Sequence, residues 1–88
     1  MENAGMDSRR KRLLYVSRHR GMQETDILLG RFAEAYLPRL SETQLDRFEA
    51  LLDEGDNDLF NWITGREAPP PAHDHDVMKL LQNFKNEL

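Results

Sequence analysis

Two histidines and two aspartates follow one another at His73-Asp74-His75-Asp76, and they resemble a metal site more than any other part of this sequence. Imidazoles two positions apart do not share a helix face. The chain has no cysteine, and His19 is the only other histidine, so nothing completes the four-ligand set of a zinc site. The pattern therefore favours capping of a helix by Asp74 over metal binding.

Side chains of the catalytic types are present but are not arranged as a recognisable active site. Ser17, His19 and Glu24 could supply a catalytic triad, yet a triad depends on geometry that closeness in sequence does not give. The sequence has no glycine-rich loop to hold the phosphates of a nucleotide or a flavin. Several carboxylates are interpreted as helix caps and solubility charges; they are Asp53, Glu54, Asp56 and Asp58. We therefore expect no catalytic residue and no stably bound metal or cofactor.

A basic stretch near the start of the chain is the sequence feature closest to a nucleic-acid site. Its members are Arg9, Arg10, Lys11, Arg12, Arg18, His19 and Arg20. Residues 1–20 hold six basic and two acidic side chains, a net charge of +4, which leaves −8 for residues 21–88 in a chain of net charge −4. Phosphate binding needs several cations on one face, and no second helix is rich in Arg, Asn or Gln. The pattern favours a basic face turned to solvent or to a protein partner.

The segment Arg20-Gly21-Met22-Gln23-Glu24 is of greater interest. Gly21 permits a turn or a close approach that any Cβ would obstruct. If Gly21 is the N-cap of a helix, Glu24 is the third helical residue and can accept a hydrogen bond from the free N–H of the cap. Arg20 offers a planar set of donors suited to a carboxylate on a partner. A tight joint between two helices explains these residues equally well.

The elements that position these residues are all predicted to be helices, because apolar residues recur at helical spacing and no alternating pattern is present. The five expected helices run from Asp7 or Ser8 to about His19, from about Met22 to Leu37, from Ser41 to Gly55, from Asp56 to Gly65, and from about Asp74 toward Leu88. Ser41 and Gln44 form a capping-box pattern at the start of the third. Pro38 and Gly65 are expected to stop the second and fourth helices.

The predicted fold is all-α, a compact five-helix bundle forming a single domain over residues 1–88. Within it, residues 1–6 are expected to be a disordered terminus, and residues 66–72 a proline-rich linker before the last helix. Trp62 is expected to be buried, since its short helix can be stable only through tertiary packing. In the last helix, Val77, Leu80, Leu81, Phe84 and also Leu88 are assigned to the inward side.

Composition favours a binding module over an enzyme. At 88 residues, with 39% hydrophobic and 32% charged residues, the chain can fold but has a thin core, too thin to enclose a large ligand. The absence of cysteine suits a reducing compartment. No apolar run approaches the length of a membrane span, and the first residues lack the core of a signal peptide. A cytoplasmic protein is the default expectation.

Around residues 20–24 the sequence resembles the SdhE or succinate dehydrogenase assembly factor 2 family, whose signature is Arg-Gly, two variable residues and Glu. Further segments fall in the expected order: Arg12-Leu13-Leu14-Tyr15, Ser17-Arg18, Ile27-Leu28-Leu29, Phe32-Ala33, Ser41 to Leu45, Asp58 with Trp62, Val77-Met78, Leu80-Leu81 and Phe84. The resemblance covers roughly residues 9–85. An ordered series of this length is far more specific than the five-residue motif alone.

The resemblance implies a five-helix bundle that binds the flavoprotein subunit of succinate dehydrogenase, and often that of fumarate reductase. It further implies that the protein promotes covalent attachment of FAD to a histidine of that subunit, so that both the FAD and the chemistry belong to the partner. Arg20, Gly21 and Glu24 match the motif, and Met22 is expected at the contact. The basic residues Arg12, Arg18 and His19 are assigned to the same partner-binding surface.

The resemblance also implies a monomer that is not an enzyme, located in a bacterial cytoplasm, or in the mitochondrial matrix for a mature eukaryotic form. Two other classes stay open at this point. One is a small nucleic-acid-binding regulator that uses the basic first helix, which a salt-sensitive gel shift would reveal. The other is an antitoxin-like regulatory binding module, whose captured partners would include no flavoprotein.

Overall fold

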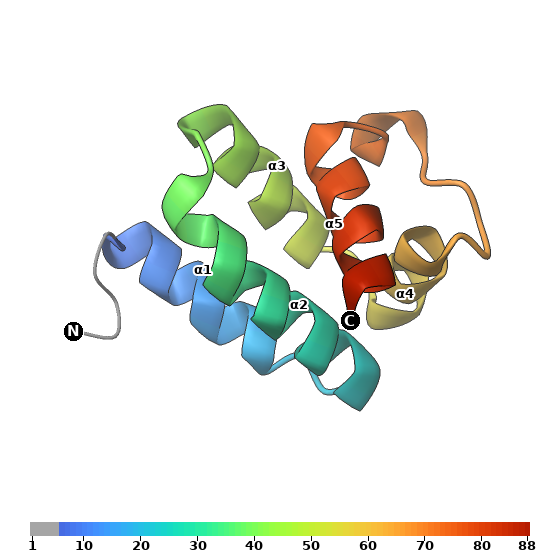
Figure 1. Cartoon of the computed structure of the whole chain (residues 1–88), viewed down its shortest axis with the longest axis horizontal. Helices are drawn as coiled ribbons and strands as arrows, with labels where there is room; N and C mark the ends of the chain where they lie inside the picture. The colour runs from blue at the N-terminus through green and yellow to red at the C-terminus, as the bar shows by residue number, and fades with distance from the viewer. Residues whose placement is uncertain (1–5) are drawn as a thin grey trace.

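The computed structural model describes residues 6–88, and within that range the chain forms five α-helices, two short 3-10 helices and no strand (Figure 1). The α-helices are α1 (Ser8–Arg18), α2 (Gln23–Tyr36), α3 (Glu42–Leu52), α4 (Asp56–Thr64) and α5 (Asp76–Glu87). The 3-10 helices are η1 (Leu37–Arg39) and η2 (Pro71–His73). The prediction of an all-α, five-helix fold is confirmed.

Three of the expected helix boundaries are confirmed by their capping geometry. The Asp7 carboxylate accepts a hydrogen bond from the Arg10 N–H at the start of α1. Ser41 and Gln44 form the complete capping box of α3, each side chain accepting from the other residue's backbone N–H. Gly65 ends α4 with φ +84°, in the left-handed region that glycine favours.

Three other boundary predictions are wrong. Helix α3 ends at Leu52 and not at Gly55, which instead is the N-cap of α4 and leaves Asp56 as the first helical residue. Helix α5 is capped by His75, whose ring nitrogen accepts a hydrogen bond from the Met78 N–H. Asp74 cannot serve there because the preceding 3-10 turn of η2 uses it as its own C-cap.

The predicted linker over residues 66–72 is extended at Pro70 and then coils at Pro71 into η2. The predicted disordered terminus over residues 1–6 falls almost entirely on residues 1–5, which lie outside the described residues. Met6 is partly buried against the core. None of the helices within residues 6–88 combines the length and the apolar character needed to cross a membrane.

Aromatic side chains mark the centre of the core. Phe32 is fully buried, and its ring lies 4.7 Å from that of Tyr36, 5.6 Å from Phe48 and 5.7 Å from Phe84, measured between centroids. Burial of each large apolar side chain contributes about 1.5–3 kcal/mol, so this cluster, which joins α2, α3 and α5, adds substantially to the stability. Trp62 is 8% exposed, which confirms its predicted burial. Leu88, assigned to the inward side, is instead 59% exposed.

Helices α1 and α2 form an antiparallel pair along one side of the molecule, and α3, α4 and α5 pack on the other (Figure 1). This arrangement brings the α1–α2 turn beside the α3–α4 turn, although the two turns are distant in sequence. The candidate site is built where these two turns meet.

Candidate functional site

The turn between α1 and α2 depends on one unusual backbone conformation. Gly21 has φ +112°, which L-residues with a side chain rarely adopt, although a Cβ placed there would meet no atom within 4 Å. Met22, with φ −104°, is the N-cap of α2 and contributes no side-chain capping bond. Glu24 is therefore the second helical residue and not the third. The capping role proposed for Gly21 and Glu24 is wrong, because the helix begins one residue later than that pattern needs.

Arg20 is an internal anchor and not a free group on the surface. Its side chain is only 10% exposed, and its Nε lies 2.6 Å from Oδ1 of Asp56. The two terminal guanidinium nitrogens donate to the backbone carbonyls of Leu52 and Glu54. The expectation that Arg20 offers its donors to a partner carboxylate is therefore not what the structure shows, because Asp56 and the two carbonyls already accept from all three guanidinium nitrogens.

The chemistry of a helix end explains why an arginine is needed here. The last carbonyls of α3 have no N–H donor within the helix. A carbonyl that is half-buried without a hydrogen bond lowers the stability of the fold. The planar guanidinium reaches together the carbonyl of Leu52, the last residue of α3, the carbonyl of Glu54 in the α3–α4 turn, and one carboxylate, which a lysine cannot do. The Arg20 backbone N–H also donates to Asp26 in the first turn of α2, at 2.8 Å. Arg20 thus joins the α1–α2 turn to both α2 and the α3–α4 turn.

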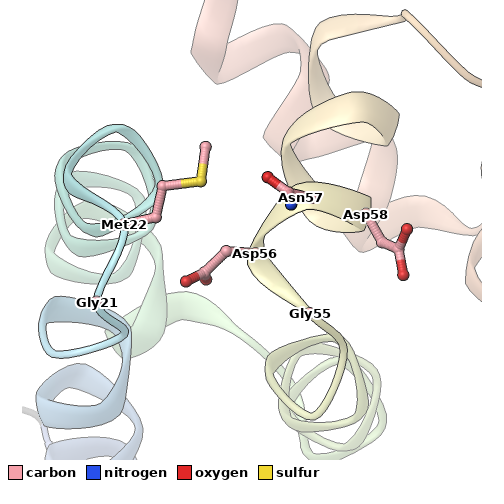
Figure 2. A pocket seen from close by; sticks show the side chains of 6 residues that line it. All are labelled: Gly21, Met22, Gly55, Asp56, Asn57 and Asp58. Atoms are coloured by element: carbon pink, nitrogen blue, oxygen red, sulfur yellow. The ribbon is translucent and has the colours of Figure 1, made fainter.

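The two joined turns enclose an open groove of about 530 Å³, which we call the junction groove. It is lined by Gly21, Met22, Gly55, Asp56, Asn57 and Asp58. Figure 2 shows Met22 extending from one wall toward α4, while the Asp56 carboxylate points from the other wall toward the α1–α2 turn. Asp58 points away from Met22, is exposed, and forms no ion pair with another residue in the range 6–88. The groove thus offers one apolar thioether and one free carboxylate.

Glu24 lies on the exposed side of the first turn of α2. No hydrogen bond or ion pair joins its carboxylate to the rest of the described chain. A negatively charged side chain in the first turn of a helix interacts favourably with the helix dipole. Glu24 is the charged residue of the motif that remains available to another molecule.

The three basic residues predicted beside the motif are exposed but do not form one cluster. Arg12 reaches α3, with its guanidinium 3.4 Å from Glu49, whereas Arg18 pairs with Glu34 on α2. These contacts place the two arginines on different sides of α1. The Arg18 stem crosses α2 at Gly30, where an added Cβ would lie 3.0 Å from the Arg18 Cγ.

His19 is the member of this basic group that lies closest to the turn. Its ring stacks on that of Tyr15 with 4.0 Å between centroids, and its Nδ1 lies 2.7 Å from the Tyr15 carbonyl oxygen. Tyr15 is 63% exposed, so the stacked pair forms a flat aromatic surface on α1. The structure thus brings together Gly21, Met22 and Glu24, keeps His19 nearby, and separates Arg12 and Arg18 from them.

Two further cations of the basic stretch, Arg9 and Arg10, have partners within the fold. Arg9 forms ion pairs with three carboxylates of α3, at 2.6–3.2 Å; they are Glu42, Asp46 and Glu49. Hydrogen bonding to Arg9 lowers the pKa of Glu49, and the same contacts, with Asp46 first, raise the pKa of Arg9. Arg10 donates to the carbonyls of Leu37 and Leu40. The first helix therefore uses its charge to dock on α3 and η1.

The histidine–aspartate run serves the packing of η2 and α5. His73 is buried beside Trp62, and its Nε2 lies 2.9 Å from a carboxylate oxygen of Glu54. His75 caps α5, and burial, helped by nearby Arg47, lowers its pKa. Across residues 6–88, no three or more acidic, histidine or cysteine side chains converge as a metal ion would require.

Sequence reasoning did not find the opposite wall of the junction groove. Asp56 and Asp58 were interpreted as caps and solubility charges, and Asp26 was not singled out. The role of Asp56 comes from the meeting of two turns that are separated by more than thirty residues. The sequence signal for this wall is an arginine after α1 together with an acidic cluster after α3. The two can be paired only when the packing of the helices is known.

Comparison with known proteins gives a consistent result. The sequence model of a family described as "Flavinator of succinate dehydrogenase" (Sdh5) matches residues 11–85. Among curated proteins, the chain is 42% identical over 87 residues to a protein of Dictyostelium discoideum and 44% identical over 87 residues to one of Danio rerio. It is 41% identical over 91 residues to one of Scheffersomyces stipitis. All three are named succinate dehydrogenase assembly factor 2, mitochondrial.

These similarities extend along nearly all of the chain but not of the relatives. They cover 98%, 94% and 98% of this chain and 62%, 55% and 61% of the three relatives, in the same order. The chain thus spans little more than half the length of the curated relatives it matches. The matched region contains both turns of the junction groove.

Proposed function

The chain belongs to the Sdh5 family, described as the flavinator of succinate dehydrogenase, and we propose that it binds the flavoprotein subunit of that enzyme and promotes covalent attachment of FAD to it. The observation that carries the proposal is that some residues of the motif hold the fold together while others are accessible to a partner. Arg20 is used inside the fold, whereas Glu24 is exposed and Met22 extends into the junction groove, both on a turn that Arg20 fixes in place. A surface of this kind is suited to docking on a protein.

The exposed groups of the site suit a partner surface of mixed character. The free carboxylates of Glu24 and Asp58 would accept hydrogen bonds from arginine or lysine side chains of the flavoprotein. The Met22 thioether would pack against an apolar side chain, since methionine adapts readily to irregular contacts. Because the two turns are already held together, little ordering cost would be added on binding.

In this proposal the chain performs no chemistry of its own. It would favour the conformation of the flavoprotein in which the modified histidine and the flavin are aligned, and such alignment can account for large rate effects. The junction groove is open and lacks a phosphate-binding loop, so we expect no stable binding of FAD by the chain alone. Purified protein that is yellow, or that binds FAD with submicromolar affinity, would contradict this part.

The proposed function also leads to expectations about the oligomeric state, the location and the further partners of the protein. We expect a monomer that acts where the flavoprotein subunit is made competent, in a bacterial cytoplasm or a mitochondrial matrix. The related subunit of fumarate reductase is a further expected partner. A nucleic-acid role is disfavoured because Arg9, Arg12 and Arg18 are paired with carboxylates, which leaves few cations to release counterions from phosphate.

The direct test supplies apo flavoprotein subunit with FAD and a dicarboxylate, with and without this chain. Covalent flavin is then followed over time by fluorescence of the denatured subunit in a gel. We expect faster appearance of covalent flavin with the chain present, at amounts well below one per subunit. Equal rates in both tubes, with the subunit shown to be competent, would contradict the proposal.

A further inference from the structure

A second groove lies on the other side of Glu24, between α2, α4 and the end of α5. It has a volume of about 340 Å³ and is lined by Glu24, Ile27, Leu28, Phe60, Thr64, Lys85 and Leu88, and we call it the apolar groove. Figure 1 shows the end of α5 lying between α2 and α4, and residues of all three helices line the groove. Apart from Glu24 and Lys85, the side chains that line it are apolar, except for Thr64, whose hydroxyl is hydrogen-bonded within α4.

The exposure of the lining residues indicates a surface that is costly to leave in water. Ile27 is 47% exposed and Leu88 is 59% exposed, and within the described residues Tyr15 is the only other large hydrophobic side chain so exposed. Single exposed hydrophobic residues are ordinary, but two that line one hollow together with Phe60 form a patch. The Thr64 hydroxyl donates to the Phe60 carbonyl at 2.6 Å, so it adds no free polar group.

The charges of the apolar groove indicate what it would accept. Glu24 and Lys85 both line it, both are exposed, and no ion pair joins either one to another described residue. A bound segment with a basic residue opposite Glu24 and an acidic residue opposite Lys85 would pair both charges while its apolar side chains cover Ile27 and Phe60. An amphipathic helix laid into a groove between helices has this composition.

Glu24 also connects this groove to the site of the proposed function. It lies in the first turn of α2 two residues after Met22, so the junction groove and the apolar groove adjoin across that turn. We infer that the apolar groove is a second docking surface for the flavoprotein subunit, occupied by an amphipathic segment of that subunit. This inference rests on the proposed function, and it adds Ile27, Phe60 and Lys85 to the contact.

The test measures the dissociation constant for the apo flavoprotein subunit by calorimetry. Ile27→Gln replaces the apolar side chain by a neutral helix former of similar length, and Ala50→Gln introduces the same polar side chain at an exposed position of α3 outside both grooves. We expect Ile27→Gln to raise Kd about fivefold or more and Ala50→Gln to leave it unchanged. Lys85→Glu should raise Kd about threefold through lost charge pairing.

The outcomes separate the two proposals. If the wild-type chain binds and Ile27→Gln binds equally well, the apolar groove is not a docking surface, while the proposed function stands. If the wild-type chain neither binds the subunit nor speeds flavin attachment, both are overturned. Concentration-dependent dimers of the wild-type chain that Ile27→Gln abolishes would assign the groove to a second copy and overturn the inference. Circular dichroism of each variant checks that the fold is retained.

Discussion

The first turn of α2 separates two grooves of different construction. On one side, the junction groove is polar and is fixed by the hydrogen bonds of Arg20 to Asp56 and to two backbone carbonyls. On the other side, the apolar groove is lined by Ile27 and Phe60, and its two charges have no internal partner. Residues adjacent in one motif therefore have different roles. Arg20 and Gly21 shape the surface, whereas Met22 and Glu24 present it.

This distinction predicts that Arg20→Ala has the largest effect on stability. It removes three guanidinium hydrogen bonds and leaves a half-buried Asp56 carboxylate without its partner. We expect the free energy of unfolding to fall by about 2–4 kcal/mol. Arg20→Lys should recover little, because an ammonium cannot reach the three acceptors together. Urea denaturation followed by circular dichroism measures both; a wild-type midpoint for Arg20→Ala would place this side chain at the surface instead.

A smaller loss of stability is expected for Gly21→Ala. The cost comes from the backbone, because φ is +112° while a Cβ there would meet no atom within 4 Å. We expect a loss of about 1–2 kcal/mol. Gly55→Ala is the matched control, since Gly55 has φ −70° and equally open space. That control should change stability by less than about 0.5 kcal/mol. Equal effects of the two substitutions would show that the conformation of Gly21 is not needed.

This result also changes what Gly21→Arg can reveal. With a negative φ at Gly21, this substitution would block a partner and leave the fold nearly intact. The positive φ means that the arginine would strain the turn as alanine does, in addition to filling the junction groove. Loss of partner binding in Gly21→Arg that exceeds the loss in Gly21→Ala would isolate the steric part of the effect. The comparison is made at a temperature where both variants are folded.

Much of the fold could be predicted from the sequence, because its signals are local. The capping box at Ser41, the Gly65 stop and the helical spacing around Phe32 each act within one turn or one helix. Boundaries that depend on competition between neighbours were missed, as at Asp74, which η2 uses before α5 can. Asp74 could cap either η2 or α5, and tertiary packing determines which of the two helices it caps.

The candidate site could be predicted only on one side. Glycine and glutamate in the motif were recognised, but the burial of Arg20 depends on Leu52 and Asp56, which approach it through tertiary packing. Nothing in the types or spacing of residues 20–24 distinguishes an arginine that faces a partner from one that faces the interior. The apolar groove likewise combines residues of three helices, and the exposure of its Ile27 and Leu88 was not foreseen.

A weaker effect is expected at the start of α5 as the pH falls. The pKa of His75 is lowered by burial and by Arg47, so the folded state resists protonation that the unfolded chain accepts below its ordinary pKa of 6.5. Stability present above pH 6.5 is therefore lost as the pH falls below that value toward the folded pKa. His75→Asn keeps an N-cap acceptor without the titration. Thermal melts at pH 7 and pH 5.5 should show a smaller drop for the variant; an unchanged drop would exclude His75 as a source.

The smallest effect on stability is expected for Glu24→Ala, and that makes it the most informative substitution for function. Glu24 is exposed, forms no internal ion pair, and contributes to the fold only through the dipole of α2. The free energy of unfolding should change by no more than about 0.5 kcal/mol. Glu67→Ala, at another exposed glutamate outside both grooves, is the matched control.

The measurement that tests the central claim most directly is the rate of covalent flavin attachment to apo flavoprotein subunit with the wild-type chain, Glu24→Ala or Glu67→Ala present. We predict acceleration by the wild-type chain and by Glu67→Ala, and a loss of about tenfold or more of that acceleration for Glu24→Ala at unchanged melting temperature. Acceleration by Glu24→Ala equal to that of the wild type would contradict the assignment of Glu24 to the contact. No acceleration by the wild-type chain would contradict the function itself.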